Sequence, residues 1–255
     1  MVALFSKKVL KHASCIIAPT KKVQSLLNSY GVNQNVHVVP TGIYLKPFLA
    51  DFHPDQKQSL LKKLDIPEDH QILLFVGRLA KEKNIEEVLD YFSKLNTPKL
   101  TLLIVGDGPH RNDLQQYSSY LSIEKKVVFT GLIKPENIVS YYQIADLFVS
   151  ASNSETQGLT YIEALACGLP AICKNDPCLE NVISNGKNGW KYNDYTDFQK
   201  AVHSLLTNPL LYQKFSLNAK EGAIRDYSSK TFAIKMEGIY AHTIAEYYLK
   251  TEYVF

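Results

Sequence analysis

Long apolar runs are missing from this 255-residue chain. None approaches the roughly 18 consecutive apolar residues of a membrane-spanning helix. Lys7, Lys8 and Lys11 interrupt the apolar stretch near the N-terminus, so that stretch does not have the pattern of a signal peptide. We therefore expect a cytoplasmic protein whose only membrane contact would be peripheral, on the inner face.

Cysteine and histidine are few, and their spacing excludes the common metal and disulfide motifs. The four cysteines form no CxxC pair and mostly lie in apolar or strand-like contexts, which is typical of reduced, buried thiols. None of the seven histidines lies at metal-ligand spacing from another histidine or a cysteine. We expect no protein-held metal.

Charge of one sign is also in short supply. The net charge is +3, and the chain is 21% charged and 45% hydrophobic, which is ordinary for a globular protein. So small a positive excess does not indicate a nucleic-acid partner. The GxGxxG pattern of a dinucleotide site is absent, so we expect no nicotinamide or flavin cofactor.

What the chain does have is a regular alternation of apolar strands and helices from residue 71 onward. The predicted strands are 72–76, 100–105, 127–130, 144–149 and 171–174. Uninterrupted apolar strands separated by helices predict a parallel sheet covered on both faces, which is an α/β, Rossmann-like doubly wound fold. Ligands bind such sheets at the carboxyl ends of the strands, where the strand order switches direction.

The regions on either side of this sheet predict a smaller unit and a helical end. Residues 1–50 contain a basic helix over 5–12 and then a strand, a helix and a strand over 14–19, 21–30 and 36–40; this βαβ unit is too small to bury both faces of its own sheet. We expect a linker over 51–68 and the sheet domain over 69–228. The helices predicted after the last strand are 179–184, 196–207 and 209–221, with a long final helix within 229–255.

The stretch 152–170 predicts an anion site. A loop rich in serine and asparagine opens a helix over 160–167. The backbone N–H groups of Gly158, Leu159 and Thr160 would lie at the positive end of that helix, which favours a phosphate-like anion. Gly158 has no Cβ and would let the anion approach closely.

Two carboxylates flank this predicted anion site. Glu155 lies on the loop and Glu163 about one turn inside the helix, with seven residues between them, so we expect them on opposite sides of the anion. Ionised carboxylates accept hydrogen bonds from vicinal diols, and a nucleotide sugar carries hydroxyls on both sides of its phosphates. The alternative interpretation is an ordinary capped helix with a solvated Glu163.

A second cationic element follows the first strand of the predicted sheet. Arg78 and Lys83 can converge on one anion, the arginine through its planar fork and the lysine as a point charge. The alternative is a solvated basic loop, because Lys81 and Glu82 lie between them.

Together these residues resemble a known family, the retaining glycosyltransferases of group 1 (family four, GT-B fold). The segment Glu155-Thr-Gln-Gly-Leu-Thr-Tyr-Ile-Glu163 looks most like the branch that glycosylates diacylglycerol. The resemblance implies that Arg78 and Lys83 grip a donor diphosphate, that Glu155 holds the donor sugar, and that Glu163 holds the ribose. It also implies that the donor cleft is lined by Gly77, Gly106, Gly131 and Leu132, with the base along the backbone at 131–132.

The same resemblance implies that part of the family's architecture lies outside this sequence. Residues 1–50 match only the last crossover of the family's N-terminal acceptor domain, which supplies the acceptor pocket and a histidine near the sugar. The final helix would cross back to that domain. We therefore expect the chain to bind UDP-glucose or a similar donor but to transfer the hexose poorly by itself, and a separately encoded N-terminal half is one expected partner.

Three functions remain open from the sequence. The first is a retaining hexosyltransferase, or its donor-binding half, acting on a glycolipid or diacylglycerol. The second is a non-catalytic nucleotide-sugar-binding or scaffold module on the same fold. The third is an epimerase or phosphorylase of similar architecture, for which the sequence contains no motif. The basic N-terminal helix is either a solvated face or a contact with an anionic membrane.

Overall fold

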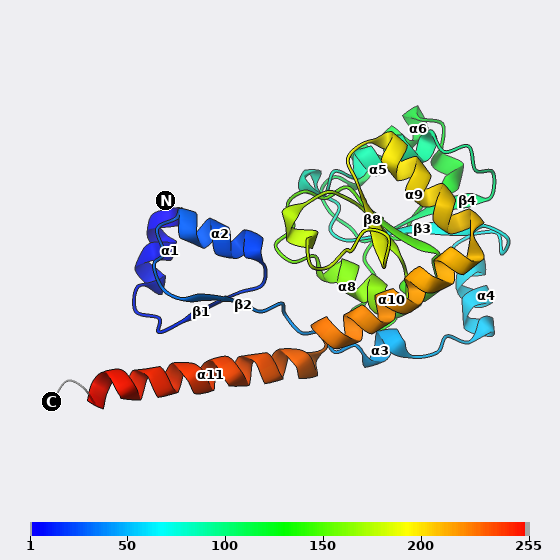
Figure 1. The fold of residues 1–255 in the computed structure, drawn as a ribbon. Coiled ribbons are helices and arrows are strands. Elements are labelled where there is room, and N and C mark those ends of the chain that lie inside the picture. The colour runs from blue at the N-terminus through cyan, green and yellow to red at the C-terminus, as the bar shows by residue number, and fades with distance from the viewer. Residues whose placement is uncertain (1, 253–255) are drawn as a thin grey trace. The chain divides into compact units, whose positions relative to one another are not determined.

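The computed structural model describes residues 2–252, and the side chains of residues 2–249 (Figure 1). The chain divides into two compact units. The first holds Met1–Tyr44 and Ile224–Phe255, and the second, the sheet unit, holds Leu45–Ala223.

The sheet unit is built on six parallel strands, which confirms the predicted α/β fold. The order across the sheet is β5-β4-β3-β6-β7-β8, and every neighbouring pair is parallel. The strands are β3 (Gln71–Val76), β4 (Leu100–Val105), β5 (Val127–Phe129), β6 (Leu147–Ser150), β7 (Ala171–Lys174) and β8 (Gly189–Tyr192). All six residues of β4 are buried, as expected for a central strand covered on both faces.

Helices cover this sheet in two groups that pack among themselves (Figure 1). One group contains α5 (Ile85–Ser93), α6 (Arg111–Tyr120) and α9 (Tyr195–Thr207). The other contains α3 (Lys46–Leu49), α4 (Pro54–Lys63), α7 (Ile138–Ile144) and α8 (Leu159–Ala166). The long α10 (Pro209–Tyr227) follows α9, and short 3₁₀ turns occur at η1 (Lys81–Lys83), η2 (Glu124–Lys126), η3 (Pro135–Asn137) and η4 (Pro177–Leu179).

The strand order fixes where a ligand can bind. The chain runs from β3 outward through β4 to β5, returns to β6 on the other side of β3, and then runs outward through β7 to β8. The direction therefore switches between β3 and β6. At such a switch point the loops after the two strands diverge to opposite faces and leave a crevice.

Several predicted boundaries were wrong, each for a local reason. Ile144 ends α7 instead of starting a strand, because a continuous apolar run does not distinguish the end of a buried helix from the start of a buried strand. The predicted linker holds α4, whose Leu61 is buried, so these residues belong to the sheet unit. The helix predicted over 179–184 does not form, since the 3₁₀ turn η4 ends at Leu179, and the short strand β8 was not predicted.

The first unit contains the predicted strand–helix–strand pattern. Its elements are α1 (Val2–Leu10), β1 (Ile16–Ala18), α2 (Lys21–Ser29), β2 (Val36–Val38) and α11 (Ser229–Glu252). β1 and β2 are parallel, and Thr20 caps α2 by accepting a hydrogen bond from the N–H of Val23 at 3.3 Å. Among the described residues, its buried apolar cluster contains Ile16, Ala18, Val32 and Val36.

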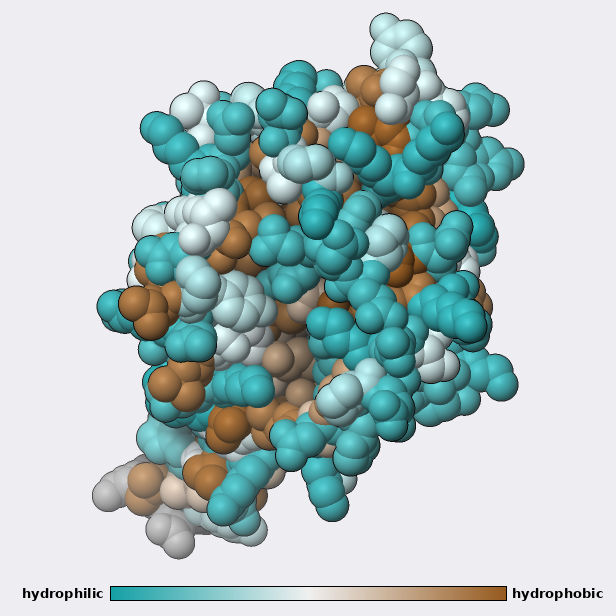
Figure 2. Space-filling model, turned by 90° about the vertical axis from the view of Figure 1, so that its right-hand side faces the viewer, coloured by the Kyte–Doolittle hydropathy of each residue, from teal (hydrophilic) through white to brown (hydrophobic). Residues whose placement is uncertain are grey.

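Large apolar side chains remain exposed on the helices of this first unit. On α1 they are Val2, Leu4, Phe5 and Val9, and on α11 they include Ile234, Tyr240 and Ile244. Within the described residues, no helix is both long and apolar enough to cross a bilayer. On the face of the molecule shown in Figure 2, by contrast, hydrophilic side chains predominate, and apolar ones are visible in the hollows between them.

Candidate functional site

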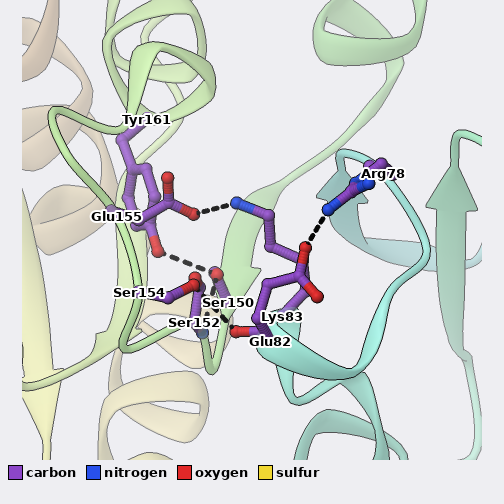
Figure 3. A network of polar contacts seen from close by, with 8 residues as sticks. All are labelled: Arg78, Glu82, Lys83, Ser150, Ser152, Ser154, Glu155 and Tyr161. Carbon is purple, nitrogen blue, oxygen red and sulfur yellow. Dashed lines mark hydrogen bonds and ion pairs between the residues drawn. The ribbon is translucent and has the colours of Figure 1, made fainter. Parts of the chain in front are cut away.

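A lysine and a glutamate meet across the switch point. Lys83, in the loop after β3, lies with its Nζ 2.6 Å from Oε1 of Glu155, in the loop after β6 (Figure 3). Both side chains are largely buried, with 22% and 15% of their surface exposed. The two residues are 72 positions apart in the chain, so the fold itself creates this pair.

The same two loops are joined by a second contact. The hydroxyl of Ser154 donates a hydrogen bond to the carbonyl oxygen of Glu82 at 3.1 Å. Beside it, the Tyr161 hydroxyl donates to Oγ of Ser150 at 2.8 Å, and that oxygen also accepts from the N–H of Ser152 at 3.3 Å (Figure 3). The Ser154–Glu82 hydrogen bond joins the β6 loop to the β3 loop, while the contacts of Ser150 connect the end of β6 to its own loop and to α8. Sequence reasoning identified none of these contacts.

Arg78 does not share a partner with Lys83 in this structure. Its guanidinium points to Glu82 and forms an ion pair with it, while two thirds of the arginine side chain is exposed (Figure 3). A backbone hydrogen bond and the pairing with Arg78 both lower the pKa of Glu82. Each of the two predicted diphosphate ligands therefore holds its own carboxylate.

Helix α8 begins one residue earlier than predicted, at Leu159, and Gly158 is its N-cap residue. Gly158 has a left-handed conformation, with φ of 73°, and a Cβ there would lie 2.8 Å from the Tyr161 ring. Glycine is the residue that adopts this conformation without strain. The N-cap residue makes no side-chain hydrogen bond to the helix start, where the backbone amides of Gly158, Leu159 and Thr160 lie.

Glu163 lies further along α8 and has a different partner from Glu155. Its Oε2 accepts a hydrogen bond at 2.6 Å from the hydroxyl of Tyr142, a buried residue of α7. Burial raises the pKa of Glu163, and the hydrogen bond from Tyr142 partly offsets this. The sequence did not predict the contact between Tyr142 and Glu163, because no sequence pattern indicates which residue of α7 lies next to which residue of α8.

The predicted lining glycines come together at the ends of β3, β4 and β5. The N–H of Gly106 donates to the carbonyl oxygen of Gly131 at 3.1 Å, and a Cβ on Gly106 would lie 1.9 Å from the carbonyl oxygen of Gly77. These glycines therefore allow close backbone packing, whether or not a ligand is present. Leu132, next in the chain, is 84% exposed.

A pocket of about 640 Å³ adjoins this exposed leucine. It opens between α4, α7 and the loop after β5, and its lining includes Leu60, Leu132, Asn137 and Tyr141. The structure therefore has a cavity beside the backbone along which the sequence predicted a base. Among the described residues, no group of three or more histidine, cysteine, aspartate or glutamate side chains is arranged to hold a metal ion.

A further polar cluster, missed from the sequence, centres on Glu87 in the first turn of α5. Its carboxylate pairs with Lys174 at the end of β7 and accepts hydrogen bonds from the Asn84 side chain at 3.0 Å and the Tyr192 hydroxyl at 3.1 Å. Asn84 directly follows Lys83 and has a left-handed conformation, with φ of 51°. The backbone at Lys83 is thereby tied to the ends of two other strands.

Comparison with known proteins identifies the family. Residues 56–222 match the family described as glycosyl transferases group 1, and the chain belongs to it. The predicted family is thus confirmed.

Two curated relatives are alpha-monoglucosyldiacylglycerol synthases. The enzyme from Streptococcus pneumoniae (strain ATCC BAA-255 / R6) is 36% identical over 251 residues, which cover 96% of this chain and 55% of the relative. The enzyme from Acholeplasma laidlawii is 33% identical over 237 residues, covering 92% of this chain and 59% of the relative. The chain therefore spans a little over half the length of these relatives.

Solved structures show the same fold. Anabaena Alr3699/HepE, in complex with UDP and glucose, superposes with a TM-score of 0.85 at 18% identity, covering 94% of this chain and 66% of that one. Sucrose-phosphate synthase from Thermosynechococcus elongatus gives 0.82 at 24% identity, covering 96% and 62%. The architecture is that of GT-B glycosyltransferases.

Proposed function

We propose that this chain carries the donor site of a retaining hexosyltransferase that binds UDP-glucose. The observation that carries the proposal is the ion pair of Lys83 and Glu155, which places a cation and an acid together at the switch point of the sheet. The helix start at Gly158 adds amide donors from the same loop as Glu155. The name of the HepE complex, which includes UDP and glucose, supports the choice of donor.

In the proposed complex each group has one task. Lys83, Arg78 and the amides of residues 158–160 bind the diphosphate. These donors stabilise the negative charge that builds on the leaving group. Released from Lys83, Glu155 accepts hydrogen bonds from the sugar hydroxyls. Glu163, oriented by Tyr142, accepts from the ribose hydroxyls.

The transfer step exchanges one bond for another at the anomeric carbon. The bond from this carbon to the diphosphate oxygen breaks, a bond to the acceptor hydroxyl oxygen forms, and the hydroxyl proton passes to an oxygen of the departing diphosphate. The configuration at the anomeric carbon is retained. No residue of the first unit is assigned to this step, so we propose that transfer requires acceptor-side residues beyond those in this chain.

We propose diacylglycerol or a glycolipid as the acceptor, reached at a membrane surface. The support is the naming of the two synthases above and the surface of α1, which carries exposed apolar residues such as Leu4 and Phe5 together with Lys7 and Lys8. A basic amphipathic helix binds anionic lipid, and each basic residue adds about 1 kcal/mol.

Calorimetric titration of the full chain with UDP-glucose tests the donor site. We expect saturable binding, and we expect Lys83→Ala to weaken it by roughly ten- to a hundredfold, because a charge-assisted hydrogen bond contributes about 1.5–3 kcal/mol. Lys94→Ala is the matched control, since Lys94 also pairs with a carboxylate, Asp90 at 2.7 Å, but at the other end of α5. A wild-type chain that binds no UDP-glucose at millimolar concentration would contradict the proposal and favour a scaffold module.

A further inference from the structure

His110 is a buried histidine held between two carboxylates. It ends the loop after β4 and directly precedes α6, and 9% of its side chain is exposed. Its Nδ1 lies 2.7 Å from Oδ2 of Asp113 on α6, and its Nε2 contacts Oε1 of Glu86 on α5. The two carboxylates therefore engage opposite nitrogens of one ring.

This arrangement suits the charged form of the ring. A neutral imidazole has a single N–H donor, so only the imidazolium donates to both carboxylates at once. The hydrogen bond to Glu86 raises the pKa of His110 against the effect of burial, and Asp113 raises it further. Glu86 and Asp113 are the charged groups that act on the ring, while the nearby Asp107 and Arg111 pair with each other at 3.1 Å.

The same residue is connected to both ends of the segment that carries the two donor cations. Its backbone N–H donates to the carbonyl oxygen of Leu79 at 3.0 Å, one residue after Arg78. Its ring holds Glu86, three residues after Lys83, in the first turn of α5. His110 thus contacts the chain at the start of segment 78–83, through its backbone, and just beyond the end of the segment, through its ring.

A close backbone approach reinforces the first of these attachments. The N–H of Leu79 donates to the carbonyl oxygen of Asp107 at 2.9 Å, and a Cβ on Gly108 would lie 2.3 Å from the Leu79 carbonyl oxygen. The β4 loop therefore lies directly against the β3 loop.

We propose that His110 is a positioning residue for the donor diphosphate. The imidazolium of His110 holds segment 78–83 in the conformation that binds the diphosphate. This inference rests on the proposed function. The raised pKa means that the interaction is complete at low pH and is lost as pH rises through that pKa. The neutral ring releases one carboxylate, the segment loosens, and the affinity for the donor falls.

Titration of the full chain with UDP-glucose at several pH values tests the inference. UDP-glucose is the probe because its diphosphate, esterified at both ends, does not titrate near neutral pH. For the wild type we expect the dissociation constant to rise by up to tenfold per pH unit above the pKa of His110. For His110→Asn we expect weaker binding with no such pH dependence.

Two further variants sharpen this test. Glu86→Gln removes the negative charge next to the His110 ring. The pKa of His110 should then be lower, so the fall in affinity should occur at lower pH. His203→Asn, on the exposed side of α9, is the matched control and should keep the wild-type profile. The inference is overturned by a His110→Asn chain that folds and retains the wild-type pH profile.

A ligand-free measurement separates this inference from the proposed function. Hydrogen exchange of the amides of residues 79–86 should show protection that decreases as pH rises in the wild type and that is already low in His110→Asn. Absence of UDP-glucose binding would overturn the proposed function alone. Equal protection in both chains at every pH would overturn the role of His110 alone.

Discussion

The two units differ in how completely they bury their sheets. In the sheet unit, six strands lie between two groups of helices, and residues such as Leu73, Leu102 and Leu147 are fully inaccessible to solvent. In the described part of the first unit, two strands share a buried apolar cluster of four residues, and α1 has no buried residue. A two-stranded sheet is at best marginally stable alone. The unit that contains Lys83 and Glu155, where we propose the donor site, is therefore also the unit with the larger buried core.

The largest expected effect is a difference in local stability between the units. Hydrogen exchange should give opening free energies near the global value in β3 and β4, and values lower by about 5 kcal/mol or more in β1 and β2. The physical reason is the small buried area behind β1 and β2. Equal protection of the two sheets, measured by hydrogen exchange and mass spectrometry, would contradict the expected difference in stability between the two units.

The next largest effect is that of a core truncation. Leu103→Ala, in the centre of β4, should cost about 2–5 kcal/mol of unfolding free energy, because it leaves a cavity in a fully buried layer. Ile16→Ala in the first unit should leave the main urea transition of the chain nearly unchanged. If both substitutions shift that transition equally, the two units unfold together.

A smaller effect is expected where backbones pack closely. Gly106→Ala would bring a Cβ to 1.9 Å from the carbonyl oxygen of Gly77, so the ends of β3 and β4 must separate. We expect a loss of roughly 1–3 kcal/mol in thermal or urea denaturation and weaker binding of UDP-glucose. Gly238→Ala on α11 is the control, because nothing lies within 4 Å of the position that its methyl group would take.

The smallest expected effect is that of Glu163 on the free energy of unfolding, which should depend on pH in a known direction. Because its folded-state pKa is raised, the folded chain binds this proton more tightly than the unfolded chain, and stability increases as pH falls through that pKa. At neutral pH, Glu163→Gln should therefore stabilise the ligand-free chain by about 1 kcal/mol while weakening UDP-glucose binding. A substitution that lowers both stability and affinity would contradict this account of the buried carboxylate.

The sequence predicted the fold where its signals are local. The apolar runs at 100–105 and 171–174 became β4 and β7 with the expected bounds, and the turn residues around Gly31 and Gly168 marked helix ends. β8 escaped prediction because its four residues include only two buried ones, too few for a clear pattern. Short strands at a sheet edge depend on their neighbours more than on their own sequence.

The sequence predicted which residues would form the candidate site, and that prediction is untested, whereas the contacts among these residues were not predicted. The observed strand order places the loops after β3 and β6 side by side, and Lys83 meets Glu155 there; the alternation of strands and helices in the sequence predicted a parallel sheet but not this order. The pairing of Arg78 with Glu82 was not predicted, because two anion ligands were expected to face one anion. The contacts of Tyr142 and His110 join residues from different helices, and no sequence pattern records such neighbours.

The most direct test of the central claim is hydrogen exchange of the full chain with and without saturating UDP-glucose. We expect the donor to slow exchange in two stretches, 78–84 and 152–160, which flank the switch point between β3 and β6. Protection confined to other parts of the sheet unit, with both stretches unchanged, would contradict it.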